Sequence, residues 1–361
     1  MGRRERRVAR SIVFAILNNK DDGKPPKKPS LLARALRLLN LYWLTFELLR
    51  RDLFSSLRSA WGIPETEYKA SFVARGSKKK KDALEPLGDM GYSGSTFFRT
   101  SDARYLVKSV PRGFENSFFK KELIVPYAEH MQHNPGSILV RITDFLQSRH
   151  KSIGMFFGLA PSHHIVMDNL LCGSSGGDEG SVPNTKWESW DLKPTSYFFP
   201  ERDVAGGALA SEATKSRLPD EFDDKIYLTV AQRDEFLAQL RRDTKLLADA
   251  NAVDYSLFLV RVTNEQDQDA QVPSVTTQQE HDGKPSWRTG ITSPDSKQTY
   301  RAAVLDFFWS KHSMHAKAMT GLIKTYNVID ERGPMSITAE SSEYRDRFVK
   351  MCEEMIEVQG E

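Results

Sequence analysis

Two apolar runs that predict buried strands are each interrupted by an aspartate. Asp254 stands in "DANAVDYSLFLV", residues 249–260, directly after a helical pattern, and Asp306 ends the run "AAVLDFF". A buried carboxylate without a partner is costly, so each aspartate must cap a turn, pair with a cation or take part in chemistry. By itself Asp254 fits a turn cap as well as a general base. The second strand-end carboxylate favours metal-assisted group transfer.

Length and composition are compatible with a two-lobed intracellular protein. The chain has 361 residues and a formal net charge of +3, so overall charge indicates no particular partner. Cys172 and Cys352 predict neither a disulfide framework nor a zinc site, which fits a reducing compartment. No secretory signal is expected, because the basic start lacks a cleavage pattern. The most apolar stretch, 38–46, is too short to span a membrane.

The first third of the chain changes composition several times. Residues 1–29 are basic and punctuated by proline, which predicts a disordered tail. Residues 30–59 have apolar side chains at helical spacing, which predicts an amphipathic helix packed on the body of the protein, with an interfacial membrane helix as the alternative. The lysines at 78–81 predict a solvated loop, with an anionic membrane as the alternative. Nucleic-acid binding is not expected, since only this cluster favours it.

The order of predicted strands, helices and polar loops predicts an α+β protein of two lobes with a cleft between them. The N-terminal lobe is expected over 30–168 and the C-terminal lobe over 169–361. Alternating apolar and polar residues predict a β-hairpin at 95–99 and 104–110. A helix–turn–helix is expected at 52–73, and further elements follow from spacing. These are helices at 114–132, 230–250 and 341–358, and strands within 137–147 and 163–171.

A turn rich in small residues precedes the hairpin and can bring backbone N–H groups close to an anion. It contains Gly91, Gly94 and Ser95, and Lys108 follows on the second strand in "YLVKSV". A turn of this kind is weak evidence alone. Together with a following strand lysine, it is the arrangement that holds nucleotide phosphates in kinases. Glu115, at the start of the next helix, could pair with Lys108 and keep it aimed at phosphates.

Segments along the chain resemble, in the same order, motifs of the phosphatidylinositol phosphate kinase family. The resemblance covers about residues 50–358, and "VDYSL" is its strongest part. It implies a two-lobed lipid-kinase fold of the α+β class, with an antiparallel sheet in each lobe, flanking helices and an ATP cleft. The segment "GPMSIT…EYRDRF" is most similar to the phosphatidylinositol 3-phosphate 5-kinase branch. The matching segments are "SGSTFF…DARYLVKSV", "YAEHMQHNPGSILVRI", "HHIVMDNLL", "WDLKPTS", "VDYSLFLV", "AVLDFF" and "EYRDRF".

The resemblance also implies roles for individual residues. Lys108 should contact the α- and β-phosphates of ATP, and Lys193 should reach the phosphates from the C-terminal lobe. Asp254 should be the catalytic aspartate near the attacking hydroxyl, and Asp306 should bind Mg²⁺. The adenine hinge and the inositide headgroup have their own implied contacts. They are Met167 and Asn169 at the hinge, and Lys311, His315 and Lys317 in a headgroup loop at 308–336.

The implied activity is an ATP- and Mg²⁺-dependent kinase that phosphorylates an inositol hydroxyl of a phosphoinositide in an anionic membrane. Such a protein is expected in the cytoplasm, peripheral on the cytosolic face, and a homodimer is left open. "DLKPTS" departs from the family pattern, because Pro194 and Thr195 replace glycine and serine and Pro194 lacks an N–H. The alternatives are therefore a catalytically weak phosphoinositide-binding scaffold and a kinase for a soluble inositol phosphate.

Overall fold

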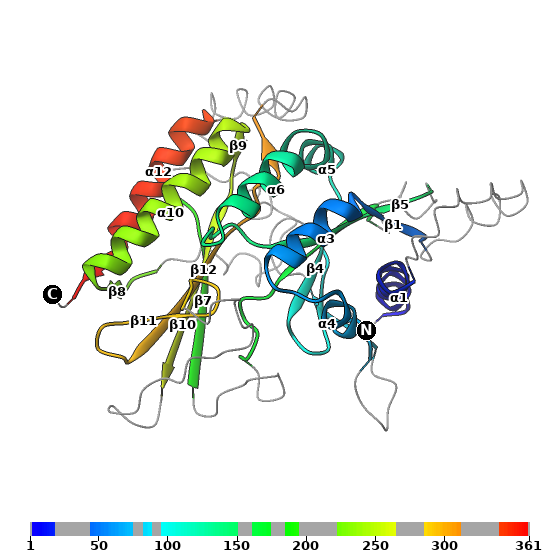
Figure 1. Ribbon diagram of the computed structural model, residues 1–361, viewed down its shortest axis with the longest axis horizontal. Helices are drawn as coiled ribbons and strands as arrows, with labels where there is room; N and C mark the ends of the chain where they lie inside the picture. The colour runs from blue at the N-terminus through cyan, green and yellow to red at the C-terminus, as the bar shows by residue number, and fades with distance from the viewer. Residues whose placement is uncertain are drawn as a thin grey trace, which may run out of the picture. The chain divides into compact units, whose positions relative to one another are not determined.

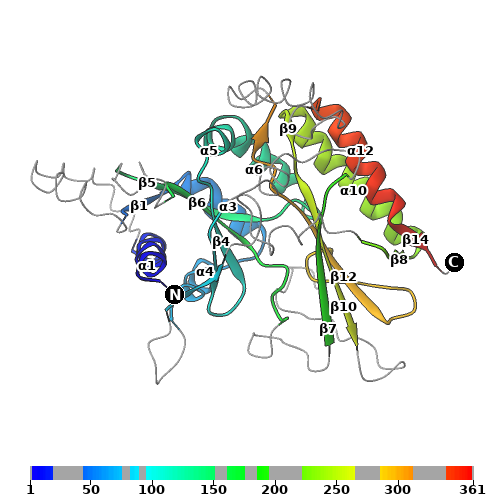
Figure 2. The ribbon, with the colours of Figure 1, turned by 180° about the vertical axis from the view of Figure 1, so that it is seen from behind.

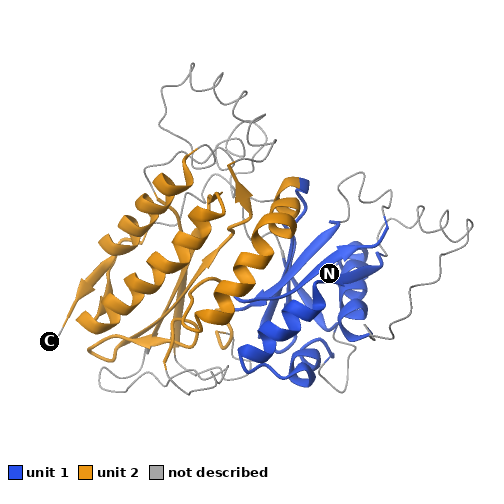
Figure 3. Ribbon diagram, turned by 45° about the horizontal axis from the view of Figure 1, so that its top comes forward, with its two compact units in different colours: residues 1–113, 141–169 blue, residues 114–140, 170–361 orange. Residues whose placement is uncertain are grey.

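The computed structural model divides the chain into two compact units (Figures 1 and 3). Unit 1 comprises Met1–Gly113 and Arg141–Asn169, and unit 2 comprises Phe114–Val140 and Leu170–Glu361. The predicted lobes differ from these units at residues 114–140, which group with unit 2, and at residues 1–29 and 169, which group with unit 1. The structure describes residues 2–18, 44–74, 82–88, 95–150, 161–174, 185–194, 222–264, 285–311 and 339–359.

A six-stranded antiparallel sheet forms the centre of unit 1, in the order β1-β5-β6-β4-β3-β2. The predicted hairpin is confirmed as β3 and β4, with Phe97 opposite Lys108. Because side chains alternate along a strand, Tyr105 and Val107 enter the core cluster while Lys108 lies on the other face. The strands are β1 (Phe46–Leu49), β2 (Leu84–Gly88), β3 (Phe97–Thr100), β4 (Tyr105–Ser109), β5 (Ile142–Ser148) and β6 (His163–Asp168).

The disordered tail predicted at 1–29 is wrong for Arg3–Leu17, which form helix α1. Val8, Ile12 and Ile16 recur every four residues and are buried in the core cluster of unit 1. Burial of this apolar face against the sheet stabilises a helix that would be marginal in isolation. The arginines dominate the composition of the segment, although its apolar spacing is helical. Residues 19–29 lie outside the described part of the chain.

The single helix predicted at 30–59 is also wrong where the structure describes it. Phe46–Leu49 form β1, and a separate helix, α3 (Arg51–Ala60), follows. Arg50, between them, has a φ of 49°, a left-handed conformation that a continuous helix excludes. Strand β1 pairs with β5 about 100 residues further along the chain, so a distant partner decides its conformation. The helix–turn–helix at 52–73 is confirmed by α3 and α4 (Glu65–Ala70).

A buried ionic network joins α3 and α4 to β5. The Arg58 guanidinium lies 3.1 Å from Asp144 and 2.7 Å from Glu65, and it donates to the Thr143 carbonyl at 2.5 Å. Tyr68 Oη donates to Asp144 at 2.7 Å, and its ring lies 4.4 Å from the guanidinium. Burial raises the pKa of Asp144, although Arg58 opposes that shift. Arg58 and Asp144 therefore depend on each other for charge compensation.

His164 is a fully buried side chain in β6, on the face of the sheet that α1 covers. Its ring meets the Phe46 ring edge-on at 5.0 Å. Neither ring nitrogen has a hydrogen-bond partner within the part of the chain that the structure describes. Burial lowers the pKa of His164 to about 3, with a smaller contribution from His163. The imidazole is therefore neutral in the folded protein at neutral pH.

This burial predicts acid sensitivity. Between pH 6.5 and about 3, the unfolded chain binds a proton at residue 164 that the folded chain does not. Stability should therefore fall as the pH falls, by up to about 1.4 kcal/mol per pH unit from this group. We expect His164→Leu to flatten this dependence in urea unfolding between pH 7 and 5. The exposed His133→Gln is the control, and an unchanged slope in His164→Leu would contradict the assignment.

Unit 2 is built on a four-stranded antiparallel sheet in the order β11-β12-β10-β7, with helices α10 and α12 packed side by side (Figures 1 and 2). The sheet strands are β7 (Thr185–Leu192), β10 (Ser256–Asn264), β11 (Ile291–Thr292) and β12 (Gln298–Leu305). The helices are α5 (Gly113–Phe118), a π-helix η1 (Phe119–Leu123), α6 (Ile124–His133), α10 (Val230–Asp249) and α12 (Ser341–Glu354). Two short pairs complete the unit, β8 (Ile226–Leu228) with β14 (Ile356–Val358) and β9 (Ala252–Val253) with β13 (Trp309–Ser310).

Both units combine an antiparallel sheet with flanking helices, which confirms the predicted α+β class. The predicted helices at 114–132 and 230–250 are found as α5–η1–α6 and α10. The helix predicted at 341–358 is found as α12 but ends at Glu354, because Ile356–Val358 pair with β8 as strand β14. Helix α10 begins with a capping box, in which Thr229 accepts from the Gln232 N–H at 3.2 Å. Within the described ranges, no helix combines the length and the apolar surface that crossing a bilayer requires.

Candidate active site

Three strands of the unit 2 sheet terminate at one edge, and each is followed or preceded by a charged residue. Ser256 opposes Leu305, and Leu257 opposes Leu192. Lys193 follows the end of β7, Asp254 precedes the start of β10, and Asp306 follows the end of β12. The register of the sheet therefore gathers Lys193, Asp254 and Asp306, which are up to 113 residues apart in sequence, at one edge.

Asp254 is paired with a lysine at this edge. Lys193 Nζ lies 3.0 Å from Asp254 Oδ2, and the two side chains are only 10% and 9% exposed. Charges this far from water need a partner, because the desolvation of either ion alone is costly. The carboxylate that interrupts the apolar run thus has a lysine partner from the neighbouring strand.

Both aspartates adopt a left-handed backbone conformation, with φ of 65° at Asp254 and 61° at Asp306. Aspartate is among the few residues other than glycine that tolerate this conformation. The two positions lie in the same interruption of a two-stranded ribbon: β10 and β12 pair up to Ser256 and Leu305, and pairing resumes in β9 and β13. Asp254 and Asp306 therefore both lie in the same short break between the two strand pairs.

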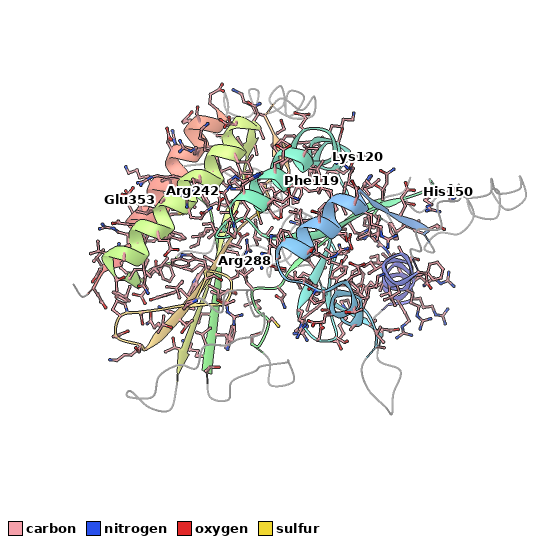
Figure 4. All side chains as sticks on the ribbon, viewed as in Figure 1. Phe119, Lys120, His150, Arg242, Arg288 and Glu353 are labelled. Carbon is pink, nitrogen blue, oxygen red and sulfur yellow. The ribbon has the colours of Figure 1, made fainter. Side chains whose placement is uncertain are left out.

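An aromatic cluster fixes the chain after Asp306. Phe307 stacks on Tyr127, with 5.9 Å between ring centroids. Phe308 meets Phe119 edge-on at 5.1 Å, and Trp309 meets Phe114 at 4.4 Å. Figure 4 shows Phe119 on the helical segment that supplies all three partners. This packing explains why residues 114–140 belong to unit 2, and it positions the strand end that carries Asp306.

Tyr344 of α12 supports the residue next to Asp254. Tyr344 Oη donates to the Tyr255 carbonyl at 2.5 Å, and the two rings meet edge-on at 4.8 Å. Phe348, one turn later on α12, contacts the same Tyr255 ring at 4.8 Å. The sequence segment "EYRDRF" therefore serves to hold the backbone beside Asp254, a role that the sequence did not reveal.

Unit 1 carries a second group of the predicted residues on its own sheet. Lys108 is 7% exposed, and its Nζ lies 5.5 Å from the Phe97 ring centroid. Lys108 opposes Ile165 and Leu106 opposes Met167, so the register places Lys108 and Met167 on the same face of adjacent strands. This face is opposite to the one that α1 covers. Lys108 and Met167 are thus brought together within unit 1.

Asn169, predicted at the adenine hinge, has a structural contact. Its Nδ2 donates to the Ala103 carbonyl at 2.6 Å, and its N–H donates to the Arg104 carbonyl at 3.0 Å. The residue therefore fastens the β3–β4 turn. Ser95 is buried just before β3, and Glu115 lies in the first turn of α5 in unit 2. Gly91 and Gly94 lie outside the described residues, and the Lys108–Glu115 pair stays a prediction.

The predicted headgroup residues are described only in part. Lys311 pairs with Glu340, and its N–H donates to the Asn251 carbonyl at 3.2 Å. His315 and Lys317 lie outside the described residues, as do the lysines at 78–81. The headgroup contacts therefore stay predictions.

Two buried arginines hold the segments of unit 2 that lead to unit 1. Arg288, labelled in Figure 4, donates to the Ser137 and Leu139 carbonyls, both at 2.5 Å. Arg301 donates to the Leu170 and Cys172 carbonyls, both at 2.9 Å. Burial lowers the pKa of Arg301 to about 10, so it remains charged at neutral pH. Sequence periodicity gave no signal for these arginines, because each acts on residues more than 100 positions away.

The edge of the unit 2 sheet also suits a magnesium ion bound together with a phosphate. Mg²⁺ in such sites takes one or two carboxylates and completes its shell with phosphate oxygens and water. Asp306 offers a half-buried carboxylate beside the Asp254 strand end. Within the described residues there is no cluster of three or more metal-binding side chains. The Asp306 carboxylate is an oxygen donor of the type that Mg²⁺ takes in such sites.

Comparisons with known proteins identify the family. A family model described as "Phosphatidylinositol-4-phosphate 5-Kinase" matches residues 78–355. A probable phosphatidylinositol phosphate kinase of Dictyostelium discoideum is 28% identical over 216 residues, covering 58% of this chain and 26% of the relative. A phosphatidylinositol 4-phosphate 5-kinase of Plasmodium falciparum is 26% identical over 223 residues, covering 57% and 12%.

The chain therefore belongs to the phosphatidylinositol phosphate kinase family, which confirms the resemblance seen in its motifs. An Arabidopsis thaliana protein named phosphatidylinositol 4-phosphate 5-kinase 5 is a further relative, 24% identical over 221 residues, with 57% of this chain and 24% of the relative covered. The matches thus span about a quarter of these relatives or less.

Proposed function

We propose that this chain is an ATP-dependent kinase that transfers the γ-phosphoryl group to an inositol-ring hydroxyl of a phosphoinositide at a membrane surface. The main support is the edge of the unit 2 sheet, where the Lys193–Asp254 ion pair and Asp306 meet in a member of this kinase family. Charge stabilisation and positioning dominate phosphoryl transfer, and these residues supply both.

In this proposal each residue has a distinct task. Asp254 accepts the proton of the attacking hydroxyl, and Lys193 orients Asp254 while placing positive charge near the transferred group. Lys108 binds the α- and β-phosphates. Asp306 would hold Mg²⁺, which supplies charge neutralisation on the phosphates when bound.

The proposed acceptor is the 5-hydroxyl. The names of relatives support a phosphatidylinositol 4-phosphate 5-kinase, whereas the segment "GPMSIT…EYRDRF" favours the 3-phosphate 5-kinase branch. Both options add phosphate at the same ring position. The second candidate function is a catalytically weak phosphoinositide-binding scaffold, and Pro194 directly after Lys193 favours it, because proline offers no N–H to a phosphate.

A radiolabel assay decides between these functions. The chain is incubated with γ-labelled ATP, Mg²⁺ and liposomes that each contain one phosphoinositide, including the 4-phosphate and the 3-phosphate. We expect label in one monophosphate lipid. In Asp306→Asn we expect the rate of labelling to fall at least about a hundredfold, because a bound metal ion stabilises the charge of the transition state by several kcal/mol. Binding to phosphoinositide liposomes without label in any lipid would favour the scaffold.

A further inference from the structure

Helix α1 has an exposed stripe that its packing on unit 1 does not use. At about 100° per residue, Arg3, Arg7, Arg10 and Phe14 fall on one side, opposite the buried Ile12. All four of these stripe residues are exposed. Phe14, at 58%, is the most exposed large hydrophobic side chain in the described part of the chain. These four residues are called the arginine stripe below.

The arginine stripe is locally unfavourable for a helix. Arginines spaced by three or four residues repel one another, and cations in the first turn oppose the helix macrodipole. Among described residues Arg3 and Arg7 form no ion pair, while Arg6 and Arg10 share Asp82 at 3.0 and 3.4 Å. Those two arginines are 48% and 58% exposed, so the pairs contribute little. A stripe that costs helix stability and combines cations with an exposed aromatic ring suits contact with an anionic partner.

We propose that the arginine stripe docks unit 1 on an anionic lipid bilayer. Guanidinium groups bind phosphate through bidentate hydrogen bonds, and the arginine stripe carries three guanidinium groups along one side of the helix. Phe14 lies among these cations, and an aromatic ring in that position suits an interface that offers both charge and hydrocarbon. An acidic protein would match the charge but would give the exposed Phe14 no comparable environment unless it also had an apolar pocket.

Docking is separate from the proposed reaction and can be measured without ATP or phosphoinositide. The test is co-sedimentation of the full chain with phosphatidylcholine vesicles, with and without phosphatidylserine. Each arginine near an anionic surface should raise partitioning about fivefold (about 1 kcal/mol). We therefore expect Arg3→Gln/Arg7→Gln/Arg10→Gln to lose roughly a hundredfold in partitioning onto phosphatidylserine vesicles. Glutamine keeps the helix propensity.

The matched control removes the same charge elsewhere. Arg241→Gln/Lys245→Gln/Lys350→Gln changes three cations on α10 and α12 whose side chains are 50%, 67% and 76% exposed, and it should sediment like wild type. Equal partitioning of wild type and the stripe variant, equal loss in the control, or equal binding to neutral vesicles would overturn the proposal. Binding to polyglutamate but not to anionic vesicles would also overturn it and would indicate an acidic protein partner.

A second measurement does not depend on the folding of the triple variant. In Phe14→Trp, the added tryptophan emission should shift to the blue on phosphatidylserine vesicles and be quenched by brominated lipids. An emission that stays unchanged relative to wild type would overturn the proposal. Phosphorylation of a short-chain, soluble phosphoinositide should be the same in wild type and the stripe variant. A failure of the proposed kinase function would instead remove activity from both while leaving docking intact.

Discussion

Asp254→Asn is expected to lower kcat about a thousandfold with folding retained. Asparagine has the shape of aspartate but cannot accept the hydroxyl proton, and a positioned general base contributes about 10²–10⁴ to the rate. Its amide also cannot compensate the Lys193 ammonium, which lies 3.0 Å away in a site only 10% exposed. Initial rates on the preferred phosphoinositide at saturating ATP measure the effect, with thermal unfolding recorded alongside.

Two further variants separate catalysis from stability. Asp295→Asn makes the same change at an aspartate that caps the exposed turn before β12, where it accepts from Ser293 Oγ at 2.6 Å, and kcat should be unchanged. Lys193→Met/Asp254→Asn removes both charges, so stability should recover relative to Asp254→Asn while activity does not. Recovery of activity in the double variant, or more than a tenth of wild-type kcat in Asp254→Asn, would mean that Asp254 is only structural.

Arg58→Met is expected to lower the free energy of unfolding by about 3–5 kcal/mol. The substitution leaves the Asp144 carboxylate, only 1% exposed, without the guanidinium 3.1 Å away, and it removes the donor to the Thr143 carbonyl. Tyr68 would remain as a hydrogen-bond donor to Asp144, but it carries no compensating charge. Urea unfolding followed by tryptophan emission measures the loss.

Two further variants test whether the loss of stability in Arg58→Met comes from the buried ionic network. Lys245→Met removes an exposed ion pair with Asp249 and should cost no more than about 1 kcal/mol. Arg58→Met/Asp144→Asn should be less destabilised than the sum of its single variants, because neither charge is left buried alone. Strict additivity, or an Arg58→Met loss no larger than that of Lys245→Met, would contradict the role of the network.

The candidate site could be predicted from sequence only as far as single residues. Asp254, Asp306 and Lys108 each interrupt or occupy an apolar strand pattern, and a charged side chain in such a pattern is visible within a window of ten residues. Their order also matches the family motifs. The Lys193–Asp254 contact was not predictable in this way, because sheet register brings together residues 61 positions apart. The support of Asp254 by Tyr344 depends on a helix 90 residues further on.

Local sequence was sufficient to predict those elements whose intrinsic helix or strand preference agrees with their place in the folded protein. The β3–β4 hairpin and helix α10 have regular periodicity, turn residues or caps, and both form near where the pattern predicts. Tertiary structure decided β1, and it stabilised α1, whose apolar spacing is helical but whose composition is that of a basic tail. Residues 3–17 have the composition of a basic tail, but the unit 1 core buries their apolar face and stabilises a helix. Phe46–Leu49 have helical spacing, but pairing with β5 makes them a strand. In both cases, burial and pairing with distant segments outweigh propensities of well under 1 kcal/mol per residue.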